Sequence, residues 1–161
     1  MRIIGGKYKG KKLIQPLDKT TRPLKDLVKE SIFNIIQHSN KINTQIKDSK
    51  ILDLYAGSGS FGLECISRDA KIVYFFENHF NAIKILNQNL SSLNENSNHK
   101  LFEKDCLDFI SSESFVVKNF DIIFLDPPFK EKKLNQILNL LLNKNILNDD
   151  GLIIIHRHIK D

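Results

Sequence analysis

The stretch ILDLYAGSGSFG, from Ile51 to Gly62, indicates the fold of this chain. An apolar run of strand length leads directly into a glycine-rich turn, and a helical pattern begins near Phe61. Gly57, Gly59 and Gly62 fit the spacing G-x-G-x-x-G, in which missing side chains let the backbone turn sharply and approach a ligand. A strand, a glycine turn and a helix in this order predict the first unit of a ligand-binding α/β sheet.

The same alternation of short apolar strands and longer helical segments continues along the chain. The later strands are expected at KIVYFFE, KLFEKD, DIIFLD and GLIIIH, and apolar residues recur at helical spacing between them (Ile83, Leu86, Leu90, Leu93; Leu134, Ile137, Leu138, Leu141). Strands separated by crossover helices predict a doubly wound, mostly parallel, Rossmann-like sheet. Ligands of such sheets bind beyond the carboxyl ends of the strands.

The N-terminal segment has a different pattern. Residues 2–16, RIIGGKYKGKKLIQP, mix short apolar pieces with glycines and lysines, which predicts a hairpin closed near Gly5-Gly6 or Lys9-Gly10. After Pro23, apolar residues at helical spacing predict an amphipathic helix, which ends in a polar linker over residues 38–50.

Positive charge is concentrated at the N-terminus. The chain has 161 residues and a net charge of +5, yet residues 1–30 alone carry nine basic residues against three acids. A local positive potential attracts a polyanion such as nucleic acid, and a solvated lysine-rich surface is the alternative. The expected nucleic-acid contacts are Arg2, Lys7, Lys9, Lys11, Lys12 and Arg22.

Composition excludes several classes of protein. The chain contains no apolar run of bilayer length and no secretory signal pattern, so we expect a cytoplasmic protein with no membrane partner. Cys65 and Cys106 are far apart in sequence and are expected to be reduced thiols. His156 and His158 share one strand face without further ligands at metal spacing, so no metal is expected and a solvated strand end is favoured.

Acidic residues follow or lie within three successive strands. Glu77, twenty positions after Gly57, can accept both ribose hydroxyls of an adenosine group. Asp53 lies inside the first strand, where a carboxylate suits an ammonium group and would repel a pyrophosphate. Asp105 can accept from an adenine amine, with the Cys106 N–H as a further ring contact. Each acid alone could be a cap or a surface residue, but together they favour S-adenosylmethionine over NAD.

The motif DPPF, from Asp126 to Phe129, follows the fourth strand. Two prolines fix φ and remove N–H donors, so the turn presents acceptors: the Asp126 carboxylate and the Pro127 carbonyl. Two acceptors on a rigid turn can hold both hydrogens of an exocyclic base amine and aim its nitrogen at a methyl group. Phe129 could stack on a base, and Pro128 is expected beside the substrate. An ordinary Asp-Pro turn is the simpler alternative.

The segments DLYAGSGSFG, FFENH and FLDPPF resemble class I S-adenosylmethionine-dependent amino-methyltransferases with a [DN]-P-P-[FYW] motif. RIIGGKYKGKKL and TRPLKDLVKESIFNII resemble more narrowly the bacterial RsmD family of ribosomal RNA guanine-N2 methyltransferases. The resemblance implies methylation of one guanine of 16S rRNA, in an assembled or assembling small ribosomal subunit. The expected catalytic residues are Asp126, Pro127 and Phe129, and the expected donor site comprises Asp53, Tyr55, Ala56, Gly57, Gly59, Glu77, Asn78, Asp105 and Cys106.

The chain departs from the family pattern at four places. It has Leu24 after Arg22-Pro23 where threonine is usual, Asn78 where an acid is usual, and His156 where a glutamate is common. The sixth and seventh strands of the class I fold are apparently missing. We therefore expect that the chain is a shortened version of a longer protein, or that an edge at GLIIIH is covered by self-association or by the N-terminal segment.

The chain is expected to form one domain, residues 1–161, with the hairpin, helix and linker in 1–48 and the donor-binding and catalytic core in 49–161. Other activities stay open at this point. They are an N6-adenine or other amino-methyltransferase, methylation at a pyrimidine carbon, an NAD-dependent dehydrogenase, and a non-catalytic RNA-binding or ribosome-assembly module.

Overall fold

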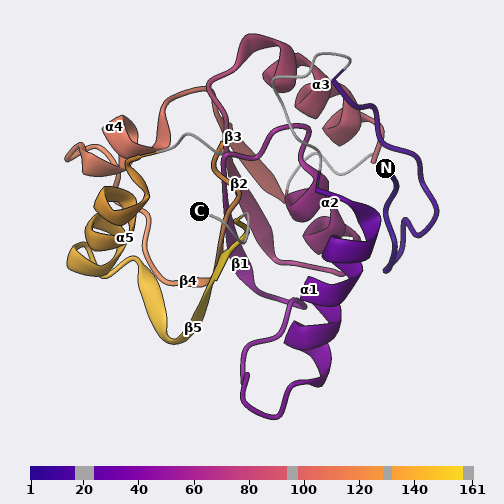
Figure 1. Cartoon of the computed structure of the whole chain (residues 1–161), viewed down its shortest axis with the longest axis horizontal. Helices are drawn as coiled ribbons and strands as arrows, with labels where there is room; N and C mark the ends of the chain where they lie inside the picture. Colours follow the sequence, from indigo (N-terminus) through magenta and orange to yellow (C-terminus); the bar gives the residue numbers. More distant parts are fainter. Residues whose placement is uncertain (17–23, 94–97, 129–131, 158–161) are drawn as a thin grey trace.

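A computed structural model describes residues 1–16, 24–93, 98–128 and 132–157, and its sheet confirms the α/β fold (Figure 1). The sheet is parallel and has the order β3-β2-β1-β4-β5. Its strands are β1 (Lys50–Leu54), β2 (Ile72–Phe76), β3 (His99–Phe102), β4 (Phe120–Leu125) and β5 (Leu147–Ile155). The chain moves outward from β1 to β3 and then returns to the other side of β1 with β4. The strand order therefore reverses between β1 and β4, which is where such sheets bind ligands.

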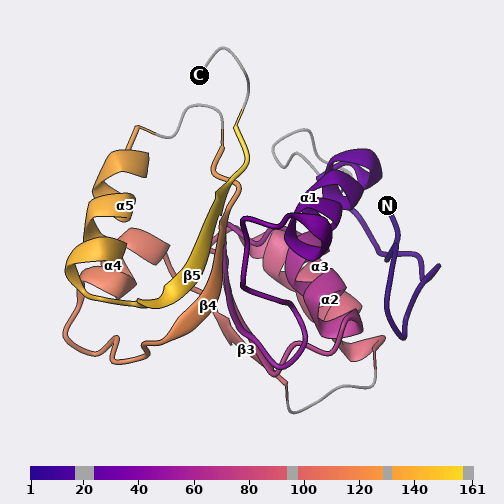
Figure 2. The ribbon, with the colours of Figure 1, turned by 90° about the horizontal axis from the view of Figure 1, so that it is seen from below.

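Helices cover both faces of the sheet (Figure 2). On one face lie α1 (Asp26–His38), α2 (Ser60–Ser67) and α3 (Phe80–Ser91), and on the other lie α4 (Cys106–Ser111) and α5 (Leu134–Asn143). Alternate residues of β1 point to opposite faces: Ile51 joins the core under α1–α3, whereas Leu52 and Leu54 join the core under α4 and α5. The same alternation directs Asp53 toward the α2 face.

Two predicted strand boundaries were wrong. The third strand ends at Phe102 and not at Asp105, because Asp105 caps α4 and the chain has already left the sheet. The fifth strand begins at Leu147, four residues before the predicted start at Gly151, and a register shift interrupts its pairing with β4 between Phe120 and Ile122. Asp149 and Asp150 conceal this part of the strand in the sequence, since charged residues are uncommon in strands.

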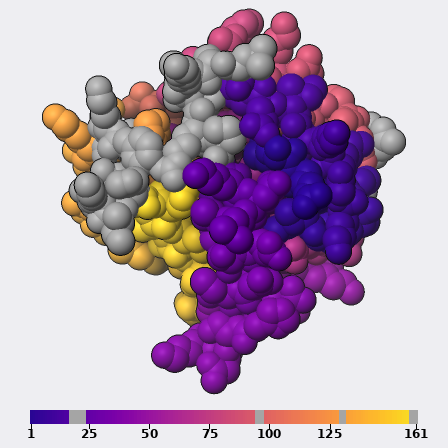
Figure 3. Space-filling model, turned by 45° about the vertical axis from the view of Figure 1, so that its right-hand side comes forward, coloured from indigo at the N-terminus to yellow at the C-terminus, as the bar shows by residue number. Residues whose placement is uncertain are grey.

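The N-terminal arm, residues 1–16, forms a hairpin-like loop without a regular ladder. Arg2 and Lys12 form one antiparallel bridge, and the Ile3 N–H donates to the Lys11 carbonyl at 2.9 Å. The loop packs on the α2 face, where the Lys7 N–H donates to the Ser67 carbonyl at 2.7 Å. In Figure 3 the arm forms a continuous surface beside α1.

β5 is an edge strand, as expected, and it pairs with β4. Its Leu152 and Ile154 pack on the core under α1–α3, and the Thr44 hydroxyl donates to the Asp150 carbonyl. Self-association through this strand stays a prediction. In the part of the chain that the structure describes, no helix is both long and apolar enough to span a membrane.

Candidate active site

The carboxyl ends of four strands bring the expected site residues into one row. Leu54 of β1 is level with Phe76 of β2 and Leu125 of β4, and Leu125 is level with Ile155 of β5. The residues that follow these four positions are Tyr55, Glu77, Asp126 and His156. The parallel register therefore gathers side chains that are far apart in sequence.

The turn after β1 depends on backbone conformations that glycine favours. Gly57 and Gly59 have φ angles of 57° and 85°, and Tyr55 also has a positive φ of 61°. A Cβ on Gly59 would lie 2.4 Å from Leu86 Cδ1, so a larger residue would displace the Leu86 side chain of α3. A Cβ on Gly57 would meet nothing within 4 Å, so this part of the turn faces open space where a ligand can approach the backbone.

Glu77 holds the glycine turn against the end of β2. Its Oε2 accepts from the Gly57 N–H at 2.7 Å, and its Oε1 accepts from the N–H groups of Asn78 and His79 at 2.9 and 2.8 Å. The sequence predicted only a ribose contact for Glu77. Both roles are compatible, because each carboxylate oxygen can accept more than one hydrogen bond. Glu77 thus fixes the backbone of the glycine turn and of the loop after β2.

Asp53 is a buried carboxyl group, 1% exposed, beneath the glycine turn. Its Oδ2 accepts from the Gly62 N–H at 2.9 Å, which fixes the start of α2 over β1. Burial is the largest cause that raises the pKa of Asp53, to about 8 in all; the Gly62 N–H opposes the rise, and the negative charges of Asp126 and Glu77 add to it. A cation brought into this site would favour the ionised carboxylate, which fits the expected ammonium contact.

Asp105 has the capping role that the sequence left open. Its Oδ1 caps α4 by accepting from the Leu107 and Asp108 N–H groups, at 2.9 and 3.2 Å. Its Oδ2 accepts from Asn78 Nδ2 at 3.3 Å, so the loop after β2 and the loop after β3 are joined. The carboxylate that is predicted to contact adenine is therefore oriented by the N-terminus of α4. The adenine contact itself stays a prediction.

The two cysteines lack the properties of nucleophiles. Both are buried and free, and burial raises the pKa of the Cys106 thiol to about 11 and that of Cys65 well above its usual value. Since the thiolate is the reactive form, both residues act as small packing groups at neutral pH. This disfavours methylation at a pyrimidine carbon, which uses a cysteine nucleophile.

Asp126 follows β4 and contacts His156. Its Oδ1 lies 2.8 Å from His156 Nδ1, and the two side chains are 20% and 14% exposed. The expectation that His156 belongs to a solvated strand end was wrong, because the β4–β5 register places its ring against Asp126. Pro127 is buried and Pro128 is exposed, whereas Phe129 and His158 lie outside the described residues.

The basic residues of the arm divide into two groups. Lys7 pairs with Asp69 at 3.6 Å, Lys11 donates to the Ser92 carbonyl, and Arg2 lies 4.0 Å from Asp26. Lys9 is exposed, and Lys12 is exposed as well. Arg22 lies outside the described residues. The arm therefore presents positive charge on the same face of the sheet as α2 and α3.

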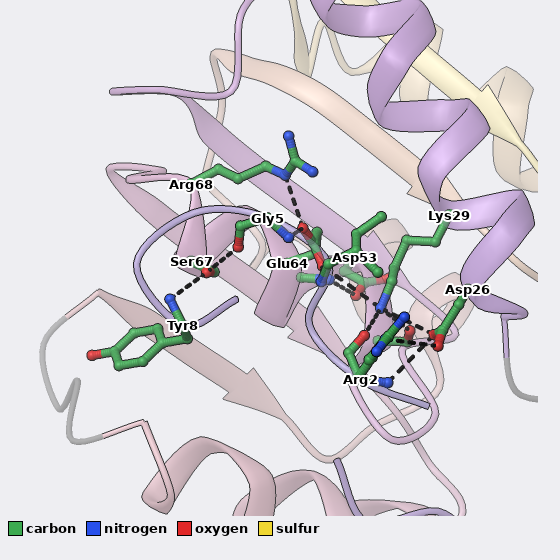
Figure 4. A network of polar contacts seen from close by, with 12 residues as sticks. Arg2, Gly5, Tyr8, Asp26, Lys29, Asp53, Glu64, Ser67 and Arg68 are labelled. Atoms are coloured by element: carbon green, nitrogen blue, oxygen red, sulfur yellow. Dashed lines mark hydrogen bonds and ion pairs between the residues drawn. The ribbon is translucent and has the colours of Figure 1, made fainter. Parts of the chain in front are cut away.

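Sequence reasoning missed a buried charged network between the arm and α2 (Figure 4). Glu64 accepts from the Ile4 and Gly5 N–H groups at 2.8 and 2.7 Å and from Arg68 Nε at 2.9 Å. Lys29 of α1 lies 3.6 Å from it, and both side chains are 0% exposed. One signal was available: Lys29 precedes Phe33 and Ile36 at the i+4 and i+7 spacing of a buried helix face.

Comparisons with known proteins agree with this geometry. A family model described as "Conserved hypothetical protein 95" matches residues 1–161. The Haemophilus influenzae protein "Ribosomal RNA small subunit methyltransferase D" is 36% identical over 156 residues, covering 96% of this chain and 77% of its own. The chain belongs to the ribosomal RNA small subunit methyltransferase D family. The Escherichia coli member is 32% identical over 161 residues, covering 100% of this chain and 76% of its own.

Solved structures support the fold of the methyltransferase D family for this chain. The structure of yhhF from Escherichia coli superimposes with a TM-score of 0.80 and 33% sequence identity, covering 95% of this chain and 78% of that one. The family confirms the RsmD resemblance, the class I methyltransferase fold and S-adenosylmethionine as methyl donor. It disfavours the NAD-dependent dehydrogenase.

Proposed function

We propose that this methyltransferase transfers a methyl group to the exocyclic N2 amine of a guanine in 16S rRNA, within the small ribosomal subunit. The reaction would take place in the cytoplasm, where ribosomal subunits assemble. The observation that carries the proposal is the position of Asp126: a carboxylate on a proline-rich turn, beside the glycine turn of the donor site. Relatives named small subunit ribosomal RNA methyltransferases support the RNA substrate.

The residues at the strand ends fit the chemistry of S-adenosylmethionine. Asp53 would face the ammonium group, Glu77 the ribose hydroxyls, and Asp105 with the Cys106 N–H the adenine ring. The backbone of Tyr55, Ala56, Gly57 and Gly59, together with Asn78, would line the remaining surface. When bound, S-adenosylmethionine supplies an electrophilic methyl group on a sulfonium sulfur.

Asp126 acts on the substrate amine. Its carboxylate and the Pro127 carbonyl each accept a hydrogen bond from one N–H of the amine, which orients the nitrogen lone pair toward the methyl carbon. Attack on the methyl carbon would form the N–C bond as the S–C bond breaks, and positive charge would develop on the nitrogen. Asp126 stabilises that charge and receives the proton that the nitrogen loses, before passing it to water.

The N-terminal arm would bind the RNA backbone. Lys7, Lys9, Lys11, Lys12 and Arg2 belong to the arm, and basic side chains of this kind contact phosphates without reading sequence. Arg22, outside the described residues, is proposed as a further contact. The target base must leave any duplex to reach a turn at the end of a sheet. Pro128 and Phe129 would contact that base.

Product analysis tests the proposal. Small subunits lacking the modification, naked 16S rRNA and DNA are incubated with labelled donor, and the products are digested to nucleosides. N2-methylguanosine from the subunits is the expected product. The Asp126→Ala variant should lose about two or more orders of magnitude in turnover while binding the donor normally, the scale of losing one preorganised group. N6-methyladenosine would support the alternative amino-methyltransferase, and no product from any substrate would support the non-catalytic RNA-binding module.

A further inference from the structure

The contact between His156 and Asp126 is built by the sheet itself. The His156 N–H donates to the Leu125 carbonyl at 2.9 Å, and the Asp126 N–H donates to the Leu54 carbonyl at 3.4 Å. The main chain of both residues is therefore held by hydrogen bonds to neighbouring strands, independently of the contact between their side chains. The 2.8 Å separation of Nδ1 and Oδ1 then leaves the Asp126 carboxylate little rotational freedom.

We propose that His156 is a positioning residue for methyl transfer, whose Nδ1–H donates to Asp126 Oδ1 and fixes the orientation of the carboxylate that accepts the substrate amine. This role rests on the proposed function. Because an ionised carboxylate only accepts hydrogen bonds, the pair requires a hydrogen on Nδ1 of the histidine ring.

The surroundings of Asp126 explain why a donor is needed there. The negative charges of Asp126 and Glu77 both act on the buried Asp53 carboxyl, so each lies within electrostatic reach of Asp53. A donor on this side of Asp126 holds its carboxylate in place beside these acidic neighbours. A hydrogen bond from the Nδ1–H of His156 fixes the oxygens of Asp126 while adding no further negative charge.

The strand geometry alone does not explain why position 156 is a histidine. The main-chain bonds that end β4 and β5 are independent of the side chain at position 156, so many residues could end β5 here. Asparagine can place its Nδ2–H near the Nδ1 position of a histidine, whereas leucine has similar bulk and no donor. These two substitutions therefore separate the hydrogen bond from packing.

Steady-state kinetics provide the first test. His156→Leu should lower kcat by about tenfold or more, with donor affinity measured by calorimetry close to wild type, because the acceptor is no longer oriented and the donor site is intact. His156→Asn should recover most of that activity. The same two substitutions at His38, an exposed residue at the end of α1, are the matched control. Full kcat in His156→Leu, or equal losses in the leucine and asparagine variants, would overturn the proposal.

Nitrogen NMR of the histidine ring provides a second test that needs no turnover. The wild-type ring should carry its hydrogen on Nδ1, and Asp126→Asn, whose amide can donate, should shift the hydrogen to Nε2. A wild-type ring protonated on Nε2 alone would overturn the proposal even if the leucine variant fails to fold. The proposed function fails separately: it falls if the methylated nucleoside is not N2-methylguanosine, whatever the response to substitutions at His156.

Discussion

At the scale of single residues, we expect the buried Asp53 to couple donor binding to pH. Its pKa of about 8 means that it is protonated in the free protein at neutral pH. The ammonium group of the donor favours the ionised form, so binding must release a proton below about pH 8. We expect the affinity for S-adenosylmethionine to rise with pH, by up to about tenfold per unit, and to level off above about 8.

Calorimetry in two buffers of different ionisation enthalpy measures this proton release. Asp53→Asn keeps an acceptor for the Gly62 N–H and cannot titrate, so its affinity should be lower and independent of pH over the same range. A wild-type protein that binds the donor without releasing a proton would show that Asp53 does not face the ammonium group.

Glu77 should affect donor binding in two ways. Glu77→Ala removes the expected ribose contact and also the 2.7 Å bond that holds the Gly57 N–H. We expect the affinity for the donor to fall by about 1.5 to 3 kcal/mol, the value of hydrogen bonds to a charged group. Glu77→Gln, which keeps one acceptor oxygen, should lose less. Unchanged affinity in Glu77→Ala by calorimetry would place the ribose elsewhere.

The residues that could be predicted from sequence share one property. Asp53, the glycines, Glu77 and Asp126 each lie in or just after an apolar strand, so local pattern and the rule for parallel sheets were enough to bring them together. The contact between Asp126 and His156 joins residues thirty positions apart and depends on the pairing of β4 with β5, in which Leu125 is level with Ile155. The sequence places both residues after apolar strands but does not show that their side chains meet, and so this contact required the structure.

At the scale of elements, the N-terminal arm carries the RNA-binding prediction. Replacing Lys7, Lys9, Lys11 and Lys12 by serine should weaken RNA binding and flatten its dependence on salt, with donor affinity unchanged. Removing one lysine–phosphate interaction should reduce the log–log salt slope by about 0.7 to 0.9. Lys9 and Lys12 should account for more of the effect, because Lys7 and Lys11 already have partners within the protein.

A matched control for this prediction lies at the opposite end of the strands. Lys41 and Lys47 are exposed in the loop that leads into the amino end of β1, far from the carboxyl ends that form the site. Replacing both by serine removes the same charge as replacing Lys9 and Lys12. Equal salt slopes for the two double variants would mean that the arm contributes net charge and no specific contact.

At the scale of the whole molecule, the network around Glu64 joins the arm, α1 and the helix that follows the glycine turn. Lys29 Nζ donates to the Arg2 carbonyl at 2.6 Å and lies 3.6 Å from Glu64 Oε2, while burial lowers the pKa of Lys29 against the raising effect of Glu64 and Asp26. The spacing of Lys29 with Phe33 and Ile36 indicates that Lys29 is buried, but nothing in the sequence identifies Glu64 as its partner. The network connects the N-terminal arm to α1 and to the helix that follows the glycine turn by buried polar contacts.

This connection can be measured with a double-mutant cycle. Lys29→Met or Glu64→Leu alone should lower the free energy of unfolding by up to about 3 to 5 kcal/mol, since each removes one partner of a buried charge and leaves only Arg68 beside Glu64 or Asp26 beside Lys29. The Glu64 variant also leaves the Ile4 and Gly5 N–H groups without their acceptor, so it should release the arm to proteolysis. The double variant should be destabilised by less than the sum of the two, by about 0.5 to 3 kcal/mol. Urea unfolding provides the energies, and a cycle whose effects simply add would show that the two charges are held independently and that the arm is attached by its other contacts.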